Sequence, residues 1–147
     1  MKKTIILLVA TLSLLSCSKN DDNVDSSEKQ LTPNHQNMAG DWNYSSVTKT
    51  DGTQVPYVGF CSTNKDYAHI IVNTRIDSHY YYDMCVHQQS TCDNYYFEGN
   101  RIKSCFEEFN NARVTYLTST TMKLEYDEDK VFGSLGFPVR GLILVKR

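Results

Sequence analysis

The sequence predicts an all-β domain, built as an antiparallel up-and-down barrel of about eight to ten short strands after a short helical turn. Three observations predict this class. Apolar and polar side chains alternate over residues 122–127, as in a strand with one buried face. Ten Tyr and six Phe with only three Pro suit a sheet, where aromatic side chains pack well. Beyond Gly40 no helical period lasts for three turns, and closure into a barrel would remove open strand edges.

The helical turn opens at Leu31-Thr32-Pro33 and ends at Gly40. Thr32 is the expected N-cap, and Pro33 stands where a missing N–H is harmless. Nine strands are expected after it, each a short apolar or aromatic run between turn or polar residues. They are 42–47, 54–58, 66–73, 79–84, 92–97, 101–106, 114–116, 122–126 and 142–145. Residues 74–78 and 118–121 are interpreted as connections between strands.

The first sixteen residues have the pattern of a secretory signal. Lys2 and Lys3 give a positive start, and the uncharged apolar stretch 5–15 is shorter than the ~20 residues that a spanning helix needs. Leu14-Leu15-Ser16-Cys17 resembles the lipobox of bacterial lipoproteins. The resemblance implies cleavage before Cys17 and acylation of that cysteine, so that lipid anchors the chain to a membrane. The alternative is an ordinary signal peptide with Cys17 left as an odd thiol.

Residues 17–30 are polar apart from Val24 and are expected to form a flexible tether, with the folded domain at 31–147. Lys19 followed by Asp21-Asp22 resembles the surface-export signal of lipoproteins from the Bacteroidota. This implies an outer-membrane protein that faces the cell exterior; the alternative is the leaflet that faces the periplasm.

Charge and motifs exclude several classes of function. Loss of Lys2 and Lys3 with the signal changes the formal net charge from −2 to −4, and no Lys/Arg cluster suggests nucleic acid as a partner. The sequence contains no nucleophile elbow, zinc-protease motif or phosphate-binding glycine loop, so we expect no enzyme and no cofactor. His69, His79 and His87 are interpreted as surface or hydrogen-bonded histidines.

Four further cysteines in an exported chain predict two disulfides, for which three pairings exist. A turn at Glu98-Gly99 would place Cys92 opposite Cys105 and is preferred to a turn at Gly99-Asn100. Cys61 then pairs with Cys85 by elimination. The alternative is a metal site made from these cysteines and His87. The spacing Cys85-x-His87-x4-Cys92, however, is not a typical zinc-binding pattern.

The segment Met38-Ala39-Gly40-Asp41-Trp42-Asn43-Tyr44 resembles the Gly-x-Trp opening of lipocalins, and the match extends through most of 31–147. The chain resembles the lipocalin-like domains of lipoproteins from the Bacteroidota, although it has four cysteines where the commoner pattern has two. The resemblance implies an antiparallel lipocalin-like barrel with no catalytic residues. It also implies that Trp42 closes one end of the barrel against a late basic side chain, Arg140 or Arg147.

Tyrosines are the richest candidates for ligand contact. In the runs 80–82 and 95–97, successive side chains face opposite sides of a strand, so that some line the barrel interior and others the outer wall. Tyr80, Tyr82 and Tyr95 are the candidate ligand-binding residues. One hypothesis is therefore a membrane-anchored binding module for a small apolar or sugar-like ligand. The other is a structural or protein-interaction module with a filled barrel and no known partner.

Overall fold

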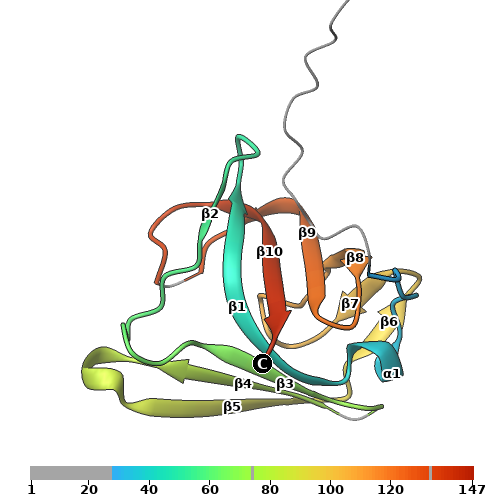
Figure 1. Ribbon diagram of the computed structural model, residues 1–147, viewed down its shortest axis with the longest axis horizontal. Helices are drawn as coiled ribbons and strands as arrows, with labels where there is room; N and C mark the ends of the chain where they lie inside the picture. Colours follow the sequence, from blue (N-terminus) through green and yellow to red (C-terminus); the bar gives the residue numbers. More distant parts are fainter. Residues whose placement is uncertain (1–27, 74, 133) are drawn as a thin grey trace, which may run out of the picture.

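The structure, a computed structural model, describes residues 28–73, 75–132 and 134–147. The expected signal peptide, Cys17 and most of the expected tether lie outside the described residues. In the described part, one short helix precedes a single antiparallel sheet of ten strands. The sheet curls strongly, so that the all-β architecture expected from the sequence is confirmed (Figure 1).

The helix α1 spans His35–Met38. The strands are β1 (Gly40–Lys49), β2 (Gln54–Pro56), β3 (Tyr67–Ile71), β4 (Arg75–Tyr81), β5 (His87–Asp93), β6 (Tyr96–Glu98), β7 (Arg101–Lys103), β8 (Arg113–Leu117), β9 (Thr121–Lys130) and β10 (Val139–Lys146). Their order in the sheet is β5-β4-β3-β1-β10-β9-β8-β7-β6, with β2 paired to β1. Among the described strands, β5 and β6 end this order without pairing, so the sheet forms a half-barrel rather than the closed ladder expected from the sequence.

The long strand β1 joins the two parts of the half-barrel. Its first residues pair with β3, its last residues pair with β2, and β10 accompanies it along most of its length. A register shift between Tyr44 and Ser46 accompanies the bend of this strand. In Figure 1, β1, β10 and β9 stand beside one another, whereas β3, β4 and β5 lie across the base of the molecule.

The concave face of the sheet holds the core. Trp42, Tyr44 and Val47 of β1 are buried, and the alternation expected in β9 is confirmed because Met122, Leu124 and Tyr126 point inward. The largest fully buried side chains include Phe109, Met38 and residues of β3, β4, β7 and β10. Side chains therefore fill most of the interior.

The helix is capped two residues later than expected. Asn34, not Thr32, is the N-cap, and its side-chain oxygen accepts a hydrogen bond of 2.8 Å from the Asn37 N–H. The Thr32 carbonyl instead accepts from the Asn37 side chain at 2.8 Å. The cap thus lies after Pro33 because Asn34 provides the better placed acceptor.

The segment between β3 and β6 differs most from the sequence prediction. Residues 75–78 belong to β4, and β5 lies in a stretch for which no complete strand was expected. Strand β5 is polar and mostly exposed on both faces, because it is an edge strand, so no alternation reveals it. The expected strand 92–97 is broken at Asn94, whose φ of 61° turns the chain between β5 and β6.

Both expected disulfides are present, joining Cys61 to Cys85 and Cys92 to Cys105, with Cα–Cα distances of 4.9 Å and 5.7 Å. The register used to predict the second pair is wrong. Phe97, not Tyr95, lies opposite Ile102, so the hairpin turns at Gly99-Asn100. Cys92 belongs to β5 and reaches Cys105 from outside that hairpin.

Candidate functional site

The side chain of Trp42, near the start of β1, is fully buried. The Trp42 indole N–H donates a hydrogen bond of 2.7 Å to the Met38 carbonyl. The Nζ of Lys146 lies 4.2 Å from the centroid of the Trp42 ring and donates to the Ala39 carbonyl at 2.5 Å. Burial lowers the pKa of Lys146 from its ordinary value.

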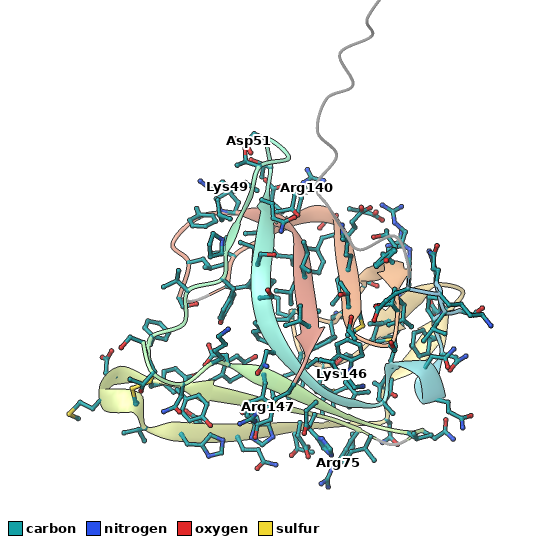
Figure 2. All side chains as sticks on the ribbon, viewed as in Figure 1. Lys49, Asp51, Arg75, Arg140, Lys146 and Arg147 are labelled. Carbon is teal, nitrogen blue, oxygen red and sulfur yellow. A yellow bond between two sulfur atoms is a disulfide. The ribbon has the colours of Figure 1, made fainter. Side chains whose placement is uncertain are left out.

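The basic side chain over Trp42 is therefore Lys146, and the expectation of Arg140 or Arg147 is wrong. Arg140 lies near Lys49 and Asp51 at the far end of β1, and its guanidinium binds Asp129 (Figure 2). Arg147 stacks on Tyr67, with 4.1 Å between the guanidinium carbon and the ring centroid. Alternation separates Lys146 from the next residue, Arg147, because two successive side chains of an extended chain face opposite sides. Arg140 is too far away, since it lies near the other end of β10.

A pocket of about 380 Å³ lies where β2, β4 and β9 end. The loops after β2, β7 and β9 supply most of its wall. Six of its lining side chains are aromatic, namely Tyr57, Phe60, Tyr80, Tyr82, Phe106 and Phe132. Asp66, Glu107 and Glu108 also line it, whereas no Lys, Arg or His does. The volume falls within the usual range for small-molecule sites.

The carboxylates in this pocket are held by tyrosines and backbone. Asp66 is 2% exposed, and it accepts hydrogen bonds of 2.8 Å from the Tyr57 hydroxyl and 2.9 Å from the Tyr81 N–H. Glu108 accepts a hydrogen bond of 2.7 Å from the Tyr80 hydroxyl. Convergent polar groups thus lie among apolar rings, the combination that orients small ligands.

Burial is the main cause of the shifted pKa values in this pocket. It raises the pKa of Asp66, although the hydrogen bonds from the Tyr81 N–H and the Tyr57 hydroxyl oppose this change. Burial also raises the pKa of the Tyr57 and Tyr80 hydroxyls, and the nearby carboxylates raise it further. Both tyrosines remain protonated near neutral pH and act as hydrogen-bond donors.

One buried hydroxyl adjoins the pocket. The Tyr44 ring packs edge-on against Tyr57 and Tyr80, with ring centroids 5.2 Å and 6.3 Å away. Tyr44 is 2% exposed, and its hydroxyl has no hydrogen-bond partner within the described residues. Burial raises the pKa of Tyr44 well above its ordinary value, so this hydroxyl also stays protonated.

The structure brings two of the three candidate tyrosines together. Tyr80 and Tyr82 line the pocket, with their ring centroids 6.4 Å apart. Tyr95 does not line it. Its side chain is buried against His35 and Phe97, at ring-centroid distances of 4.7 Å and 6.2 Å, and burial raises its pKa to about 12. Tyr95 therefore belongs to the core beside α1.

Sequence reasoning missed the acidic side of the pocket. Glu107 and Glu108 follow the expected strand 101–106 and were not among the candidate residues, yet both line the pocket. Asp66 was placed at the start of a strand, but it directly precedes β3 and points inward. The inward direction of Asp66 could have been predicted from the sequence. Asp66 stands two residues before Ala68, on the side of the chain whose apolar side chains face the core. No such prediction was available for the glutamates, because their position depends on how the loop after β7 folds.

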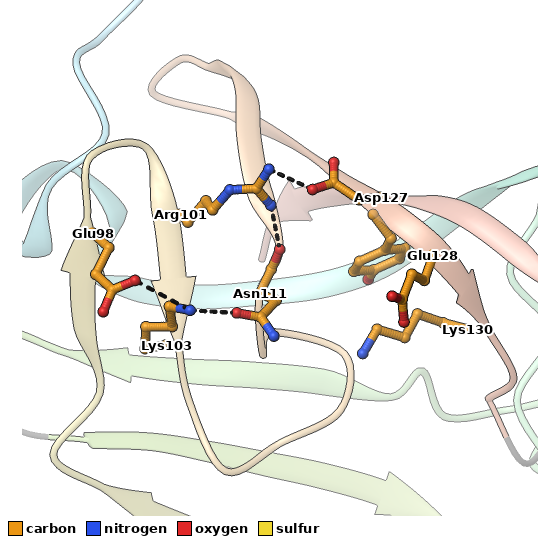
Figure 3. A pocket seen from close by; sticks show the side chains of 8 residues that line it. Glu98, Arg101, Lys103, Asn111, Asp127, Glu128 and Lys130 are labelled. Atoms are coloured by element: carbon orange, nitrogen blue, oxygen red, sulfur yellow. Dashed lines mark hydrogen bonds and ion pairs between the residues drawn. The ribbon is translucent and has the colours of Figure 1, made fainter.

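A second pocket, of about 410 Å³, is lined mainly by charged side chains from β6, β7 and β9. These charges largely bind one another: Arg101 pairs with Asp127 at 2.5 Å, and Lys103 pairs with Glu98 at 3.2 Å (Figure 3). The Asn111 side chain also accepts from Lys103. Much of this surface is therefore a network of exposed ion pairs, in which Glu98, Arg101, Lys103 and Asp127 already have partners.

The histidines make contacts with other side chains. His69 Nδ1 lies 2.5 Å from the Asp41 carboxylate, and His79 Nδ1 lies 3.0 Å from His87 Nε2. Within residues 28–73, 75–132 and 134–147, no group of three His, Cys, Asp or Glu side chains could hold a metal ion. The same part of the chain has no helix that is both long and apolar enough to span a membrane.

The curled antiparallel sheet and the short helix before it define a lipocalin-like fold. The chain is similar to the crystal structure of a lipocalin-like protein from Bacteroides uniformis, with a TM-score of 0.53 and 13% sequence identity. The alignment covers 76% of this chain and 99% of the other. No protein-family model and no curated protein matches the sequence. At this identity the likeness concerns the fold alone.

Proposed function

We propose that this protein is a non-enzymatic lipoprotein of the outer membrane, anchored by lipid on Cys17, that binds a small apolar or sugar-like ligand outside the cell. The pocket of about 380 Å³ is the observation that carries the binding proposal. Its aromatic rings offer stacking surface, and Asp66, Glu108 and the tyrosine hydroxyls offer hydrogen bonds. The resemblance of residues 14–17 to a lipobox supports the anchor.

The position of Glu28, the first described residue, suits this arrangement. Glu28 accepts hydrogen bonds of 3.2 Å and 2.8 Å from the hydroxyls of Ser119 and Thr120, in the turn that precedes β9. Phe132, which lines the pocket, follows the other end of β9. A strand of ten residues is about 30 Å long, at roughly 3.3 Å per residue. A tether leading from Glu28 to a membrane would therefore attach at the end of β9 remote from the pocket.

Native mass spectrometry of the chain purified from its own host tests the binding proposal. We expect a mass increment for a non-covalent small molecule that disappears on denaturation. Denatured protein should still carry the acyl groups, and their location on Cys17 can be read by fragmenting the amino-terminal peptide. Protein that carries no small molecule in several independent preparations would contradict the binding proposal, and an unacylated amino terminus would contradict the anchor.

A second candidate function, a protein-interaction module, is favoured by one exposed apolar surface. Five of the eight exposed large hydrophobic side chains in the described residues lie in the loop after β2 and around the turn between β4 and β5. They are Val58, Phe60, Tyr82, Met84 and Val86. The disulfide between Cys61 and Cys85 joins the two segments, and the Phe60 and Tyr82 rings stack at 5.8 Å. Photo-crosslinking from position 84 on intact cells tests this function, which predicts one recurrent protein adduct.

A further inference from the structure

The charge of the candidate pocket is one-sided. Asp66, Glu107 and Glu108 contribute three carboxylates to the lining, and the lining contains no basic side chain. Among the described residues, none of these three carboxylates forms an ion pair, although seven such contacts occur elsewhere in the protein. The partners of Asp66 and Glu108 are neutral hydroxyl and amide donors. The pocket therefore has a negative charge that the protein does not balance.

The aromatic rings surround these carboxylates. Tyr57 and Tyr80 each donate a hydrogen bond to a carboxylate, which fixes both the ring and the acidic group. Phe60 and Tyr82 form a stacked pair in the same lining. Aromatic faces attract cations through their quadrupole, most strongly where water is excluded. Rings and carboxylates in one pocket therefore favour the same sign of charge in a ligand.

The backbone packs closely around Asp66. A Cβ atom built at Gly59 would lie 2.8 Å from the Asp66 Oδ2 atom, so the loop after β2 approaches this carboxylate as closely as glycine permits. A carboxylate in such surroundings loses water, and a bound cation restores favourable interactions that desolvation removed. The contact explains how a half-open pocket holds a carboxylate that is almost fully buried.

We propose that the ligand of this pocket is an organic cation, an ammonium group carrying apolar substituents, held between the aromatic rings and the carboxylates of Asp66 and Glu108. This inference rests on the proposed binding function and adds the charge of the ligand to it. An apolar ammonium compound uses both features of the lining. A neutral sugar or a fatty acid would leave the carboxylates unbalanced or would be repelled by them.

Isothermal titration calorimetry with choline as the probe tests the inference, using the full chain purified in detergent. The comparison compound is the uncharged isostere of choline in which carbon replaces nitrogen. It has nearly the same shape without the charge. We expect choline to bind at least about fivefold more tightly than the isostere, as a partly desolvated cation–π contact of ~1 kcal/mol implies. Equal binding of the two compounds, or no binding of choline, overturns the inference.

Variants locate the effect in the pocket. Glu108→Gln keeps an acceptor for the Tyr80 hydroxyl and removes one charge, so choline binding should weaken about fivefold while binding of the isostere stays unchanged. Glu128→Gln is the matched control, because Glu128 is exposed and lines the other pocket. It makes the same chemical change and should leave choline binding unaltered. Equal losses in both variants would mean general electrostatic attraction and would overturn the assignment to this pocket.

Together, native mass spectrometry and the binding measurements distinguish a failure of this inference from a failure of the proposed function. If native mass spectrometry finds a bound neutral or acidic molecule, or if methyl glucoside binds while choline does not, the pocket binds small ligands but the charge assignment is wrong. If the purified protein carries no molecule and none of the three probes binds, the binding function fails together with the inference. Circular dichroism of each variant establishes that a lost signal does not reflect unfolding.

Discussion

Cys92 and Cys105 form a disulfide across the opening of the half-barrel. Cys92 belongs to β5, which ends the strand order on one side, and Cys105 follows β7, which lies next to the other end. The backbone ladder does not join these ends among the described strands. The covalent bond therefore spans the gap that hydrogen bonds leave. Because Cys105 also lines the pocket just before Phe106, the same bond positions the pocket wall.

Replacement of both Cys92 and Cys105 by Ser should lower the free energy of unfolding by about 3 kcal/mol, the expected value for a short closed loop. It should also speed amide hydrogen exchange in β6 and β7, since their end of the sheet loses its tie to β5. Urea unfolding and exchange mass spectrometry measure the two effects. The control is the Cys61→Ser/Cys85→Ser pair, which should reduce stability but leave exchange in β6 and β7 almost unchanged. The opposite exchange pattern would contradict the role assigned to Cys92–Cys105.

Lys146, rather than Arg140, should stabilise the surroundings of Trp42. Lys146→Met keeps most of the apolar stem but removes the cation over Trp42 and the donor to the Ala39 carbonyl. We expect a loss of about 1–2 kcal/mol of unfolding free energy. Arg140→Met removes an exposed ion pair with Asp129 and an exposed hydrogen bond to the Asp127 carbonyl, and it should cost less than about 1 kcal/mol. Urea unfolding of the two variants under the same conditions makes the comparison, and a larger loss for Arg140→Met would contradict it.

The parts of the fold that follow from periodicity were predictable. Strand β9 alternates strictly over residues 121–127, and the expected strand 122–126 lies within this part. Strand β5 was not predictable in this way, because as an edge strand it exposes both faces and carries no apolar alternation. The pairing of Cys92 with Cys105 was predicted correctly from a register that proved wrong. The positive φ of Asn94 brings Cys92 near Cys105 by another path, and nothing in the local pattern indicated it.

The candidate pocket was predictable only in its tyrosines. Tyr80 and Tyr82 share one side of a strand by alternation, so their joint presence in the lining follows from the sequence. Tyr95 was placed in the same group because its neighbourhood was expected to be one unbroken strand. The turn at Asn94 instead directs it into the core beside His35. Glu108 reaches the pocket through a loop whose course depends on tertiary contacts.

Burial of Asp66 should make stability depend on pH in a defined direction. Its pKa is raised in the folded protein, so between the ordinary and the raised value the folded state binds more protons than the unfolded state. Ionisation of Asp66 then lowers stability as the pH rises through this window. The groups that face Asp66 are the Tyr57 hydroxyl and the Tyr81 N–H, with Glu107 and Glu108 in the same pocket lining.

Asp66→Asn removes this titration with almost no change in size. We expect the unfolding free energy of the wild type, relative to that of Asp66→Asn, to fall as the pH rises from about 3.8 through the raised pKa. Urea unfolding of both proteins over a pH series measures the difference. Glu128→Gln, at an exposed site, should show no such trend. A difference that increases with pH would mean that hydrogen bonding outweighs burial at Asp66.

Variants of Cys17 and of the proposed export signal test acylation and surface display separately. Cys17→Ala should abolish acylation and release the protein from the membrane fraction, because one residue carries the anchor. Replacement of Lys19, Asp21 and Asp22 by Ala keeps the lipobox, so the chain should remain acylated and membrane-bound. It should, however, become protected from proteinase K added to intact cells. Immunoblotting of digested and undigested cells measures this. Ser26→Ala/Ser27→Ala, a change of similar extent later in the same polar segment, should leave the protein accessible. Full digestion of the Lys19/Asp21/Asp22 variant on intact cells would show that these residues do not direct export.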